Sequence, residues 1–495
     1  MAEISEYLKL ERDQDWRVAL RASMKNKERT QLERVSMSEQ PPEKRNKDFT
    51  EVNCGLSEED ARKEAQRCLD CVNPTCITGC PVNINIPKFI KRIEEGNFLE
   101  SARVLKETNA LPAVCGRVCP QEIQCEQACF YTQKLKKDPV AIGHLERFVA
   151  DFEQHSGKMS VPGIPRKNGI KVASIGSGPA GLAFAGDMAK MGYDVTVFEA
   201  LHEVGGVLKY GIPEFRLPNR IVDVEIDVLE KMGVKFVRNF IVGATASVED
   251  LKKEGFEAFM VGSGAGLPNF MHIPGENYIG IYSSNEYLTR VNLMHAADPE
   301  YDTPVLPGKK VAVIGGGNTA MDAVRTSKRL GAERSMIIYR RSIEEMPARN
   351  EEIKHAQEEG VEFMNLHNPL EYYADENGRV CRMKLQKMEL GEPDASGRRR
   401  PIPIEGSEFT MEVDTVVVSV GVSPNPLIPS SMKELDVSRW GTIVVDQESM
   451  HSSVKGVFAG GDIVRGGATV ILAMGDGRKA AGAMNEYLKS KAKTE

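Results

Sequence analysis

Eight of the ten cysteines lie in one stretch of the chain and form two runs of four. The runs are Cys68, Cys71, Cys76 and Cys80, and then Cys115, Cys119, Cys125 and Cys129. Two zinc sites of four thiolates each are one interpretation. A closely spaced pair followed by a cysteine before proline is instead typical of a run that binds 4Fe-4S clusters. We favour two 4Fe-4S clusters, because zinc carries no electrons and the same chain continues into glycine-rich patterns, described below, that suit a redox dinucleotide.

Residues 171–200 are typical of a strand, a glycine-rich turn, a helix and a second strand that closes with Glu199. The turn has the spacing G-x-G-x-x-G and comprises Gly176, Ser177, Gly178, Pro179, Ala180 and Gly181. Its glycines permit a tight turn, close approach to a pyrophosphate and close packing of helix on strand. The helix start offers free N–H groups to phosphate, and Glu199 suits a ribose hydroxyl. The strand–turn–helix–strand context disfavours the alternative, a glycine turn without a ligand.

The same unit is repeated over residues 306–342. Its turn comprises Gly315, Gly316, Gly317, Asn318, Thr319 and Ala320. Here the second strand ends not in an acid but in Arg340 and Arg341. Arginine accommodates a 2′-phosphate where an acid would repel it, and its fork of donors suits phosphate. The pair therefore favours NADP, with an ordinary basic strand end as the alternative.

Several elements must position these residues. We expect a helix over 57–67, capped by Ser57, before the first cysteines, and one amphipathic helix over 86–108 between the two runs. A glycine- and proline-rich segment over 205–218 suits a loop against a flat ring, or a plain surface loop. Further segments are a hairpin tip over 391–401, strands over 415–426 and 456–462, and a helix over 468–488. The last three have the chemistry to complete the first dinucleotide domain, so the second would be an insertion.

Length and composition narrow the class of protein. A chain of 495 residues suggests about three domains. The net charge of -7 and the pI near 5.8 argue against a nucleic-acid partner. Without an apolar span or a signal-peptide core, we expect no membrane contact and a cytoplasmic protein with reduced thiols. Cys54 and Cys381 are then plain small residues, and the charged residues 1–50 are a solvated tail or a docking helix.

Together these features resemble one family of flavoproteins. Two dinucleotide units, one inserted in the other, are similar to the flavin-dependent pyridine-nucleotide reductases. The cysteine array makes the resemblance more specific, to the small subunit of glutamate synthase over residues 48–490. It is carried by CLDCVNPTCITGCPVNINIP, ALPAVCGRVCPQEIQCEQAC, AIGHLERF, GSGPAG, GGGNTAMD, YRR and GGDIVRGGATVILAMGDGRKAA. The large subunit of the ferredoxin:NADP+ transhydrogenases and the N-terminal half of dihydropyrimidine dehydrogenase share this architecture and differ in the partner that receives electrons.

The resemblance implies an α/β flavoprotein with two Rossmann-like dinucleotide-binding units and an N-terminal α-helical ferredoxin-like domain. The expected divisions are a charged extension (1–47), an α-helical iron–sulfur domain (48–160), the first part of an FAD domain (161–305), an inserted NADPH domain (306–412) and the second part of the FAD domain (413–495).

The resemblance also implies the contacts of each nucleotide. FAD lies on Gly176–Gly181 with its ribose at Glu199, and Gly206 and Leu208 line the cofactor. Further FAD positions, at the ribityl chain and the flavin ring, are Gly461, Asp462, Thr469 and Val470. The start of the last helix then favours negative charge on the reduced ring. NADPH is expected on the turn that begins at Gly315, with its 2′-phosphate on the arginine pair described above.

The implied reaction is hydride transfer from NADPH to FAD, followed by single electrons through the clusters. We expect no catalytic side chain. The inserted unit lacks the Cys-x2-Cys of a dithiol relay, and the Met-Ala start lacks the terminal cysteine of a glutamine amidotransferase. The partner is a large glutamate-forming subunit or, in a transhydrogenase, a smaller flavoprotein with ferredoxin as an acceptor. The protein is then an oligomer. The arginine pair argues against a third hypothesis, a scaffold that binds FAD only structurally.

The division of ligands between the clusters is less simple than the two runs. In the bacterial run the cysteine before proline serves the other cluster, which predicts one set of Cys68, Cys71, Cys76 and Cys129. The other set then holds Cys80, Cys119 and Cys125 and needs one more ligand. Cys115 is a candidate on composition. The segment AIGHLERF resembles a family segment that supplies a side-chain oxygen, and this favours Glu146.

Overall fold

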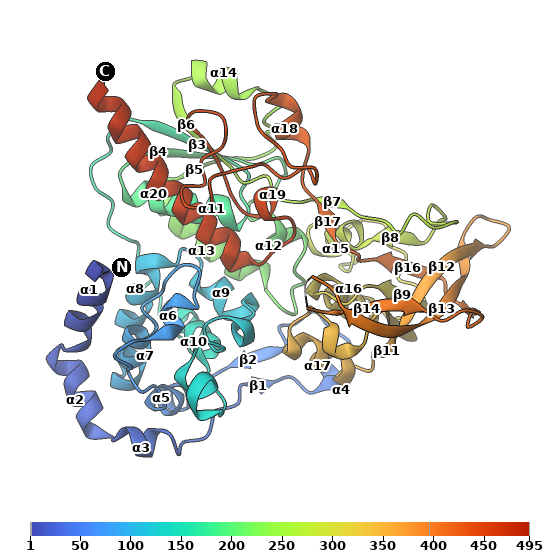
Figure 1. The fold of residues 1–495 in the computed structure, drawn as a ribbon, viewed down its shortest axis with the longest axis horizontal. Helices are drawn as coiled ribbons and strands as arrows, with labels where there is room; N and C mark the ends of the chain where they lie inside the picture. Colours follow the sequence, from blue (N-terminus) through green and yellow to red (C-terminus); the bar gives the residue numbers. More distant parts are fainter. Residues whose placement is uncertain (1, 396, 495) are drawn as a thin grey trace.

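The first glycine turn follows the central strand of a five-stranded parallel sheet (Figure 1). The computed structural model describes residues 2–395 and 397–494 and orders these strands β18-β6-β3-β4-β5. Their bounds are β3 (Lys171–Ile175), β4 (Asp194–Phe198), β5 (Lys235–Val237), β6 (Phe256–Val261) and β18 (Val457–Ala459). Because β18 comes from the C-terminal part of the chain, the sheet joins two distant segments.

Helices cover both faces of this sheet. They are α11 (Pro179–Lys190), α12 (Val207–Tyr210), α13 (Asn219–Lys231), α14 (Val248–Lys253), α18 (Leu427–Ser431), α19 (Asp462–Arg465) and α20 (Val470–Thr494). Val172 packs in the same core as Leu182 of α11, whereas the next residue, Ala173, packs with Leu251 of α14. This alternation is the period of a strand buried on both sides. Helix α20 packs so closely on α11 that a Cβ at Gly477 would lie 2.2 Å from the Ala180 carbonyl oxygen.

The second glycine turn follows the central strand of another parallel sheet, ordered β11-β10-β9-β16-β8. Its elements are β8 (Ile281–Ser283), β9 (Lys310–Ile314), β10 (Arg334–Tyr339), β11 (Glu362–Asn365), β16 (Thr415–Val418), α15 (Ser284–Asn292), α16 (Asn318–Arg329), η3 (Ile343–Glu345) and α17 (Asn350–Glu358). The domain bounds expected from the sequence assign β8 and β16 to the two parts of the FAD domain. In the structure, however, β16 pairs with both β9 and β8. The inserted unit is therefore wider than 306–412. An apolar run fits any buried parallel sheet, so its composition does not reveal its partners.

An antiparallel sheet extends from this second unit. It comprises β12 (His367–Ala374), β13 (Val380–Pro393), β14 (Arg399–Pro403) and β15 (Phe409–Glu412). The hairpin between β13 and β14 matches the tip expected over 391–401. A second antiparallel pair, β7 (Leu267–Pro268) and β17 (Val422–Ser423), lies where the chain passes between the two parallel sheets.

The cysteine-rich region is helical. Its elements are α5 (Glu58–Gln66), α6 (Thr75–Thr78), α7 (Ile86–Glu95), α8 (Phe98–Thr108), α9 (Pro112–Val118), η1 (Gln121–Ile123), η2 (Tyr131–Leu135) and α10 (Ile142–His155). Ser57 caps α5, as expected, by accepting the Asp60 N–H at 3.1 Å. The single helix expected over 86–108 is wrong. It breaks at Gly96, whose φ of 89° is the left-handed conformation that ends helices.

The N-terminal extension packs against the rest of the molecule. It contains α1 (Ala2–Arg12), α2 (Asp15–Ser23), α3 (Asn26–Arg29), β1 (Ser38–Glu39) and α4 (Pro42–Arg45), and β1 pairs with β2 (Asn53–Gly55) of the next domain. The charges that suggested a solvated tail include buried arginines: Arg17 pairs with Asp70, Arg29 with Glu94 and Arg45 with Glu359. Hydropathy does not distinguish such paired arginines from solvated ones.

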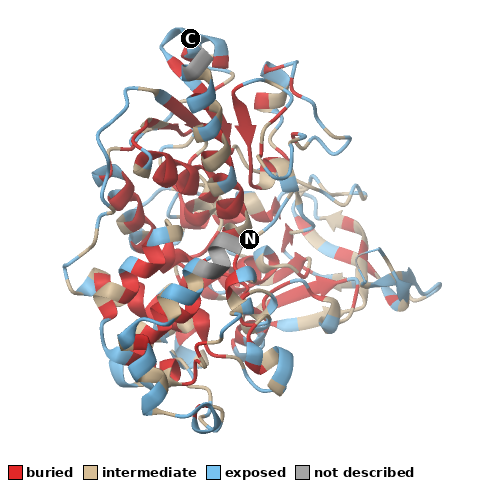
Figure 2. Ribbon diagram, turned by 60° about the vertical axis from the view of Figure 1, so that its left-hand side comes forward, coloured by how far each residue is buried: buried red, intermediate tan, exposed pale blue. Residues whose placement is uncertain are grey.

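Figure 2 shows the buried residues concentrated in the parallel sheets and the helices beside them, with exposed residues along the outer hairpin and the long connections. No helix in the described part of the chain is long and apolar enough to cross a membrane.

Candidate active site

One cleft of about 1960 Å³ is lined by the glycine turns of both parallel sheets. Carboxyl ends of parallel strands are where open α/β sheets bind their ligands. Both expected nucleotide sites therefore open into the same space. The described cleft wall includes Gly178, Gly317 and Arg340, and also Tyr210 from α12.

The glycines of the first turn have three different surroundings. Gly176 has a φ of +102°, and a Cβ there would lie 2.4 Å from the Gly262 carbonyl oxygen. A Cβ at Gly181 would lie 2.1 Å from the Gly176 carbonyl oxygen, and Gly181 faces away from the cleft. Nothing lies within 4 Å of the Cβ position of Gly178. The first and third glycines thus serve tight packing, whereas the second leaves a cradle into which a pyrophosphate fits.

Glu199 is buried at the end of β4 and is bound to the turn itself. Its Oε2 accepts hydrogen bonds from the N–H and the hydroxyl of Ser177, at 3.0 and 2.5 Å, and its Oε1 accepts from the N–H of Leu201 at 2.8 Å. The carboxylate therefore fixes the turn as well as facing the cleft, which suits a ribose hydroxyl donor.

The other expected FAD residues divide into two sets. Those that line the cleft are Gly206, Gly461, Asp462, Thr469 and Val470. Burial raises the pKa of Asp462 to about 6, and the N–H of Leu472 donates to the Thr469 hydroxyl at the start of α20. Leu208 is fully buried and is not part of the cleft wall. The neighbours that face the cleft from the same short helix are Val207 and Tyr210, because successive helical residues point in different directions.

The second turn repeats the pattern of the first. Gly315 has a φ of +144°, and a Cβ there would lie 2.3 Å from the Ser419 carbonyl oxygen. Gly317 has open space at its Cβ position, like Gly178. Gly315, Gly316, Gly317, Asn318 and Thr319 line the cleft, whereas Ala320 is buried behind them. The side-chain oxygen of Asn318 accepts the Arg349 N–H at 3.0 Å, which fixes the helix start.

The two expected 2′-phosphate residues differ. Both line the cleft, but Arg340 is exposed and Arg341 is buried. Arg341 pairs with Asp394 at 2.7 Å and donates to the Arg399 carbonyl oxygen at 2.8 Å. Arg398, on the same hairpin, also lines the cleft. Sequence reasoning missed Arg398, because the residues that bring the hairpin to the cleft are far apart in the chain.

Cysteines from both runs meet around a small cavity of about 30 Å³. The four that line it are Cys68, Cys71, Cys76 and Cys129. Burial raises the pKa of Cys68 to about 12, and all eight cysteines of the two runs are free thiols. Four thiols facing one space suit an iron–sulfur cluster, whose iron takes the place of the thiol protons.

The remaining four cysteines gather around Glu146 of α10. The carboxylate is close enough to act electrostatically on Cys80, Cys115, Cys119 and Cys125. Burial raises the pKa of Glu146 to about 8, although the side chain of Asn109 donates to its Oε1 at 2.8 Å. Among the described residues, no lysine or arginine forms an ion pair with Glu146. A buried carboxylate without a cation fits a position beside bound iron.

This second group lies next to the nucleotide cleft. Val118 and Pro120, the two neighbours of Cys119, are part of the cleft wall. All four cysteines of the group are buried, whereas Cys71 and Cys76 of the first group are only half-buried. The second group therefore adjoins the cleft and the first group lies nearer the surface.

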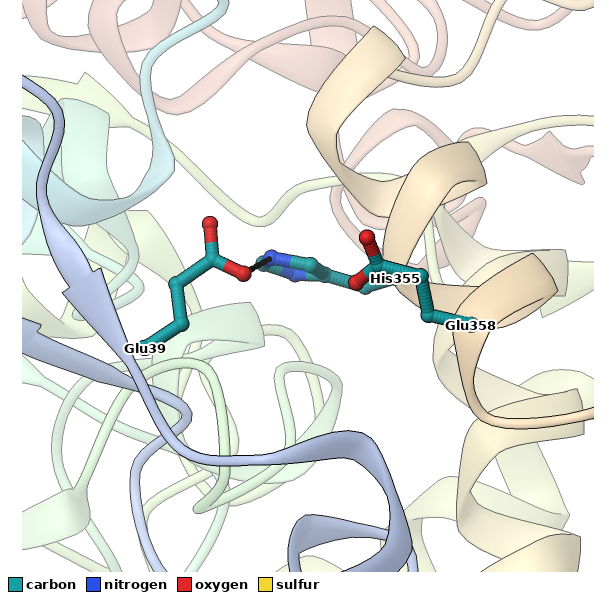
Figure 3. Close-up of side chains that lie close together, drawn as sticks. All are labelled: Glu39, His355 and Glu358. Atoms are coloured by element: carbon teal, nitrogen blue, oxygen red, sulfur yellow. Dashed lines mark ion pairs between the residues drawn. The ribbon is translucent and has the colours of Figure 1, made fainter.

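Glu39, His355 and Glu358 converge where the N-terminal segment meets α17 (Figure 3). Nε2 of His355 lies 3.1 Å from Oε2 of Glu39. Arg45 pairs with Glu39 at 3.2 Å and with Glu358 at 2.6 Å, and Lys354 pairs with both carboxylates. Such ligand types suit a metal ion, but the two cations already neutralise the carboxylates. The group is an ion cluster that joins the extension to the second nucleotide unit.

Family models match two parts of the chain. Residues 45–158 match dihydropyrimidine dehydrogenase domain II, 4Fe-4S cluster, and residues 170–477 match the pyridine nucleotide-disulphide oxidoreductases. These matches confirm the expected order of an iron–sulfur domain followed by the dinucleotide-binding fold.

Curated relatives extend over nearly the whole chain. The small chain of NADPH-type glutamate synthase from Azospirillum brasilense is 39% identical over 458 residues, 91% of this chain and 94% of that protein. The Escherichia coli small chain is 37% identical, over 92% of this chain and 98% of that protein. The NADPH-Fe(3+) oxidoreductase subunit beta of Geobacter sulfurreducens is 38% identical, over 86% of this chain but 65% of that protein.

Two solved structures share the fold. FprA of Mycobacterium tuberculosis in complex with NADPH has a TM-score of 0.56 at 19% identity, over 66% of this chain and 86% of that one. Lactococcus lactis thioredoxin reductase has a TM-score of 0.50 at 18% identity, over 65% of this chain and 99% of that one. At these identities the likeness concerns the fold alone.

Proposed function

Because the chain belongs to the family of glutamate synthase small chains, we propose that it is the electron-input subunit of such an enzyme. It oxidises NADPH and delivers the electrons to a large subunit that forms glutamate. The observation that carries this proposal is the single cleft that holds both glycine turns and adjoins the second cysteine group at Val118 and Pro120.

The residues of the chain bind and orient, and the bound groups do the redox chemistry. FAD supplies hydride acceptance, and the iron–sulfur clusters supply single-electron transfer. The helix starts after Gly178 and Gly317 offer N–H groups to the two pyrophosphates. Glu199 takes the FAD ribose, and the start of α20 at Thr469 and Val470 favours negative charge at the flavin end of the cleft. Arg340 supplies positive charge for the NADPH 2′-phosphate.

We assign two 4Fe-4S clusters to the two groups of thiols. Cys68, Cys71, Cys76 and Cys129 hold one cluster, which their shared cavity supports. Cys80, Cys119, Cys125 and Glu146 hold the other, which the unpaired buried carboxylate supports. The cluster held by the second group would lie beside the cleft, and the cluster held by the first group would lie nearer the surface at Cys71 and Cys76. Clusters of this kind need reduced thiols, which is consistent with the cytoplasm.

The share of each relative's length that this chain covers favours the glutamate-forming partner over other electron acceptors. The chain covers 94% and 98% of two small chains but only 65% of the NADPH-Fe(3+) oxidoreductase subunit. The match to the small chains leaves little of either protein unaligned. The partner is accordingly the large subunit, in a hetero-oligomer.

The first test is the reduction of the isolated chain, loaded with FAD and iron. Anaerobic NADPH should bleach the visible flavin absorbance without any partner, because both nucleotide turns lie on one polypeptide. Bleaching that needs a second subunit would contradict the proposal. The second test uses the purified complex. Glutamine plus 2-oxoglutarate should reoxidise the NADPH-reduced flavin, whereas reoxidation that needs oxidised ferredoxin together with NAD+ would point to a transhydrogenase.

A further inference from the structure

The hairpin between β13 and β14 belongs to the outer antiparallel sheet (Figure 1). Its turn contributes a residue to the wall of the nucleotide cleft. Its register pairs Pro393 with Arg399. The N–H of Asp394 donates to the Arg398 carbonyl oxygen at 2.8 Å and closes the turn. Arg398 lines the same cleft as the second glycine turn. The hairpin therefore places a third arginine beside Arg340 and Arg341.

Two contacts hold the hairpin against the end of β10. The guanidinium of Arg341 pairs with Asp394 at 2.7 Å and donates to the Arg399 carbonyl oxygen at 2.8 Å. Arg399 in turn pairs with Glu345 at 2.9 Å. Arg341 is buried, and two of its donor groups are already used. It is thus committed to the hairpin rather than to a ligand.

We propose that Arg398 joins Arg340 in recognising the 2′-phosphate of NADPH, and that Arg341 is a positioning residue that holds Arg398 in place. This rests on the proposed function and deepens it. Two arginines line the cleft from different elements, Arg340 just after the end of β10 and Arg398 from the hairpin turn. A doubly charged phosphate between two arginine forks gains charge-assisted hydrogen bonds from both.

The test compares binding of adenosine 2′,5′-bisphosphate and 5′-AMP to the FAD-loaded protein by calorimetry. Arg398→Ala should weaken bisphosphate binding about tenfold or more and leave 5′-AMP unchanged, because a charge-assisted hydrogen bond is lost. Arg400→Ala is the matched control: this arginine is exposed on β14, it is not part of the cleft wall, and its loss changes the net charge equally. It should bind both ligands like the wild type.

Asp394→Asn tests the positioning role, since it breaks the ion pair of Arg341 and retains all three arginines. It should weaken the bisphosphate and not 5′-AMP, and it should raise the KM for NADPH without lowering kcat. Equal affinities of Arg398→Ala and Arg400→Ala for the bisphosphate would overturn the proposal. So would an equal loss of affinity for the bisphosphate and for 5′-AMP in Arg398→Ala. If the wild type itself binds the bisphosphate no better than 5′-AMP, the NADPH assignment fails instead.

Discussion

The Sγ atom of Cys115 lies 3.6 Å from the Sδ atom of Met474. Met474 is fully buried in α20, whose first turn lines the cleft through Val470 and Ala473. The next residue, Gly475, packs on the iron–sulfur domain so closely that a Cβ there would lie 3.0 Å from the Pro81 carbonyl oxygen. About one turn of helix therefore separates the flavin end of the cleft from the second cysteine group.

Met474→Ala should destabilise this junction by about 2–5 kcal/mol, because it leaves a cavity in a packed core. Met474→Leu keeps the volume and should cost less than about 1.5 kcal/mol. Thermal unfolding of the FAD-loaded protein and iron analysis measure both effects. We expect the alanine variant to lose iron more readily than the leucine variant. An alanine variant with wild-type stability and iron content would show that the contact does not support the second group.

Cys115 and Glu146 compete for the last ligand position of the second group. We expect Cys115→Ser to keep about eight irons, the content of two 4Fe-4S clusters. Glu146→Ala should alter the electron paramagnetic resonance spectrum and the reduction potential, because a carboxylate is a harder ligand than a thiolate.

The controls for this pair are Cys381→Ser, at a cysteine outside both groups, and Glu146→Gln, which keeps a side-chain oxygen. Suppose Cys115→Ser loses about four irons, the content of one cluster, while Glu146→Ala keeps all its iron and its spectra. The oxygen-ligand assignment is then wrong and the all-cysteine set stands.

Glu199→Ala should weaken FAD binding and leave NADPH binding intact. The carboxylate accepts three hydrogen bonds from Ser177 and Leu201, and its removal leaves buried donors unsatisfied at a cost of about 1–3 kcal/mol. Fluorescence titration of the apoprotein with FAD measures the affinity. Glu203→Ala, on the same loop but outside the cleft wall, is the control. Equal affinities of the two variants for FAD would show that the FAD ribose binds elsewhere.

The glycine turns could be predicted from the sequence because each is a local pattern. Gly176 and Gly178 differ in surroundings as the spacing predicts. The proline rule is also a local pattern, and its division of the cysteines stays a prediction, which the cavity shared by cysteines of both runs supports. The end of a helix is also signalled within its own segment. Gly96 lies within the single helix expected over 86–108, and its left-handed conformation ends α7.

Pairing between distant segments could not be predicted in this way. The run Thr415–Val418 is apolar enough for either parallel sheet, and only the fold assigns it to the second. The sequence also does not reveal the direction in which each side chain points. Arg340 and Arg341 are adjacent and chemically identical, yet Asp394 on a distant hairpin binds one and not the other. The buried arginines of the extension have partners such as Asp70 and Glu359, which the sequence does not bring together.

Glu39 and His355 should make the attachment of the N-terminal segment sensitive to acid. The His355 imidazole, whose Nε2 lies 3.1 Å from Oε2 of Glu39, lowers the pKa of Glu39 to about 2, from 4.5. A lowered pKa stabilises the folded contact above about pH 4.5, and this stabilisation is lost as the pH falls toward 2. Because Glu39 is partly exposed, we expect Glu39→Gln to cost about 1 kcal/mol at pH 7.

Hydrogen exchange over residues 38–55 measures this effect. At pH 7 exchange in Glu39→Gln should be about fivefold faster than in the wild type, and at pH 3.5 the ratio should be smaller. Glu254→Gln, an exposed residue elsewhere, serves as control. A ratio that stays constant or grows as the pH falls contradicts the sign of the shift.

Val72 and Phe130 mark the surface where we expect electrons to leave. Val72 is 57% exposed and follows Cys71, and Phe130 is 40% exposed and lines the cavity of the first cysteine group. Exposed apolar side chains beside such a site suit a protein contact.

Val72→Glu should leave the reduction of flavin by NADPH unchanged and weaken binding of the large subunit about tenfold, since a buried charge costs more than about 1.4 kcal/mol. Val444→Glu, at a similarly exposed valine on the FAD side, is the matched control. Stopped-flow reduction and titration with the large subunit separate the two steps. Equal partner affinity in both variants would place the exit on another face.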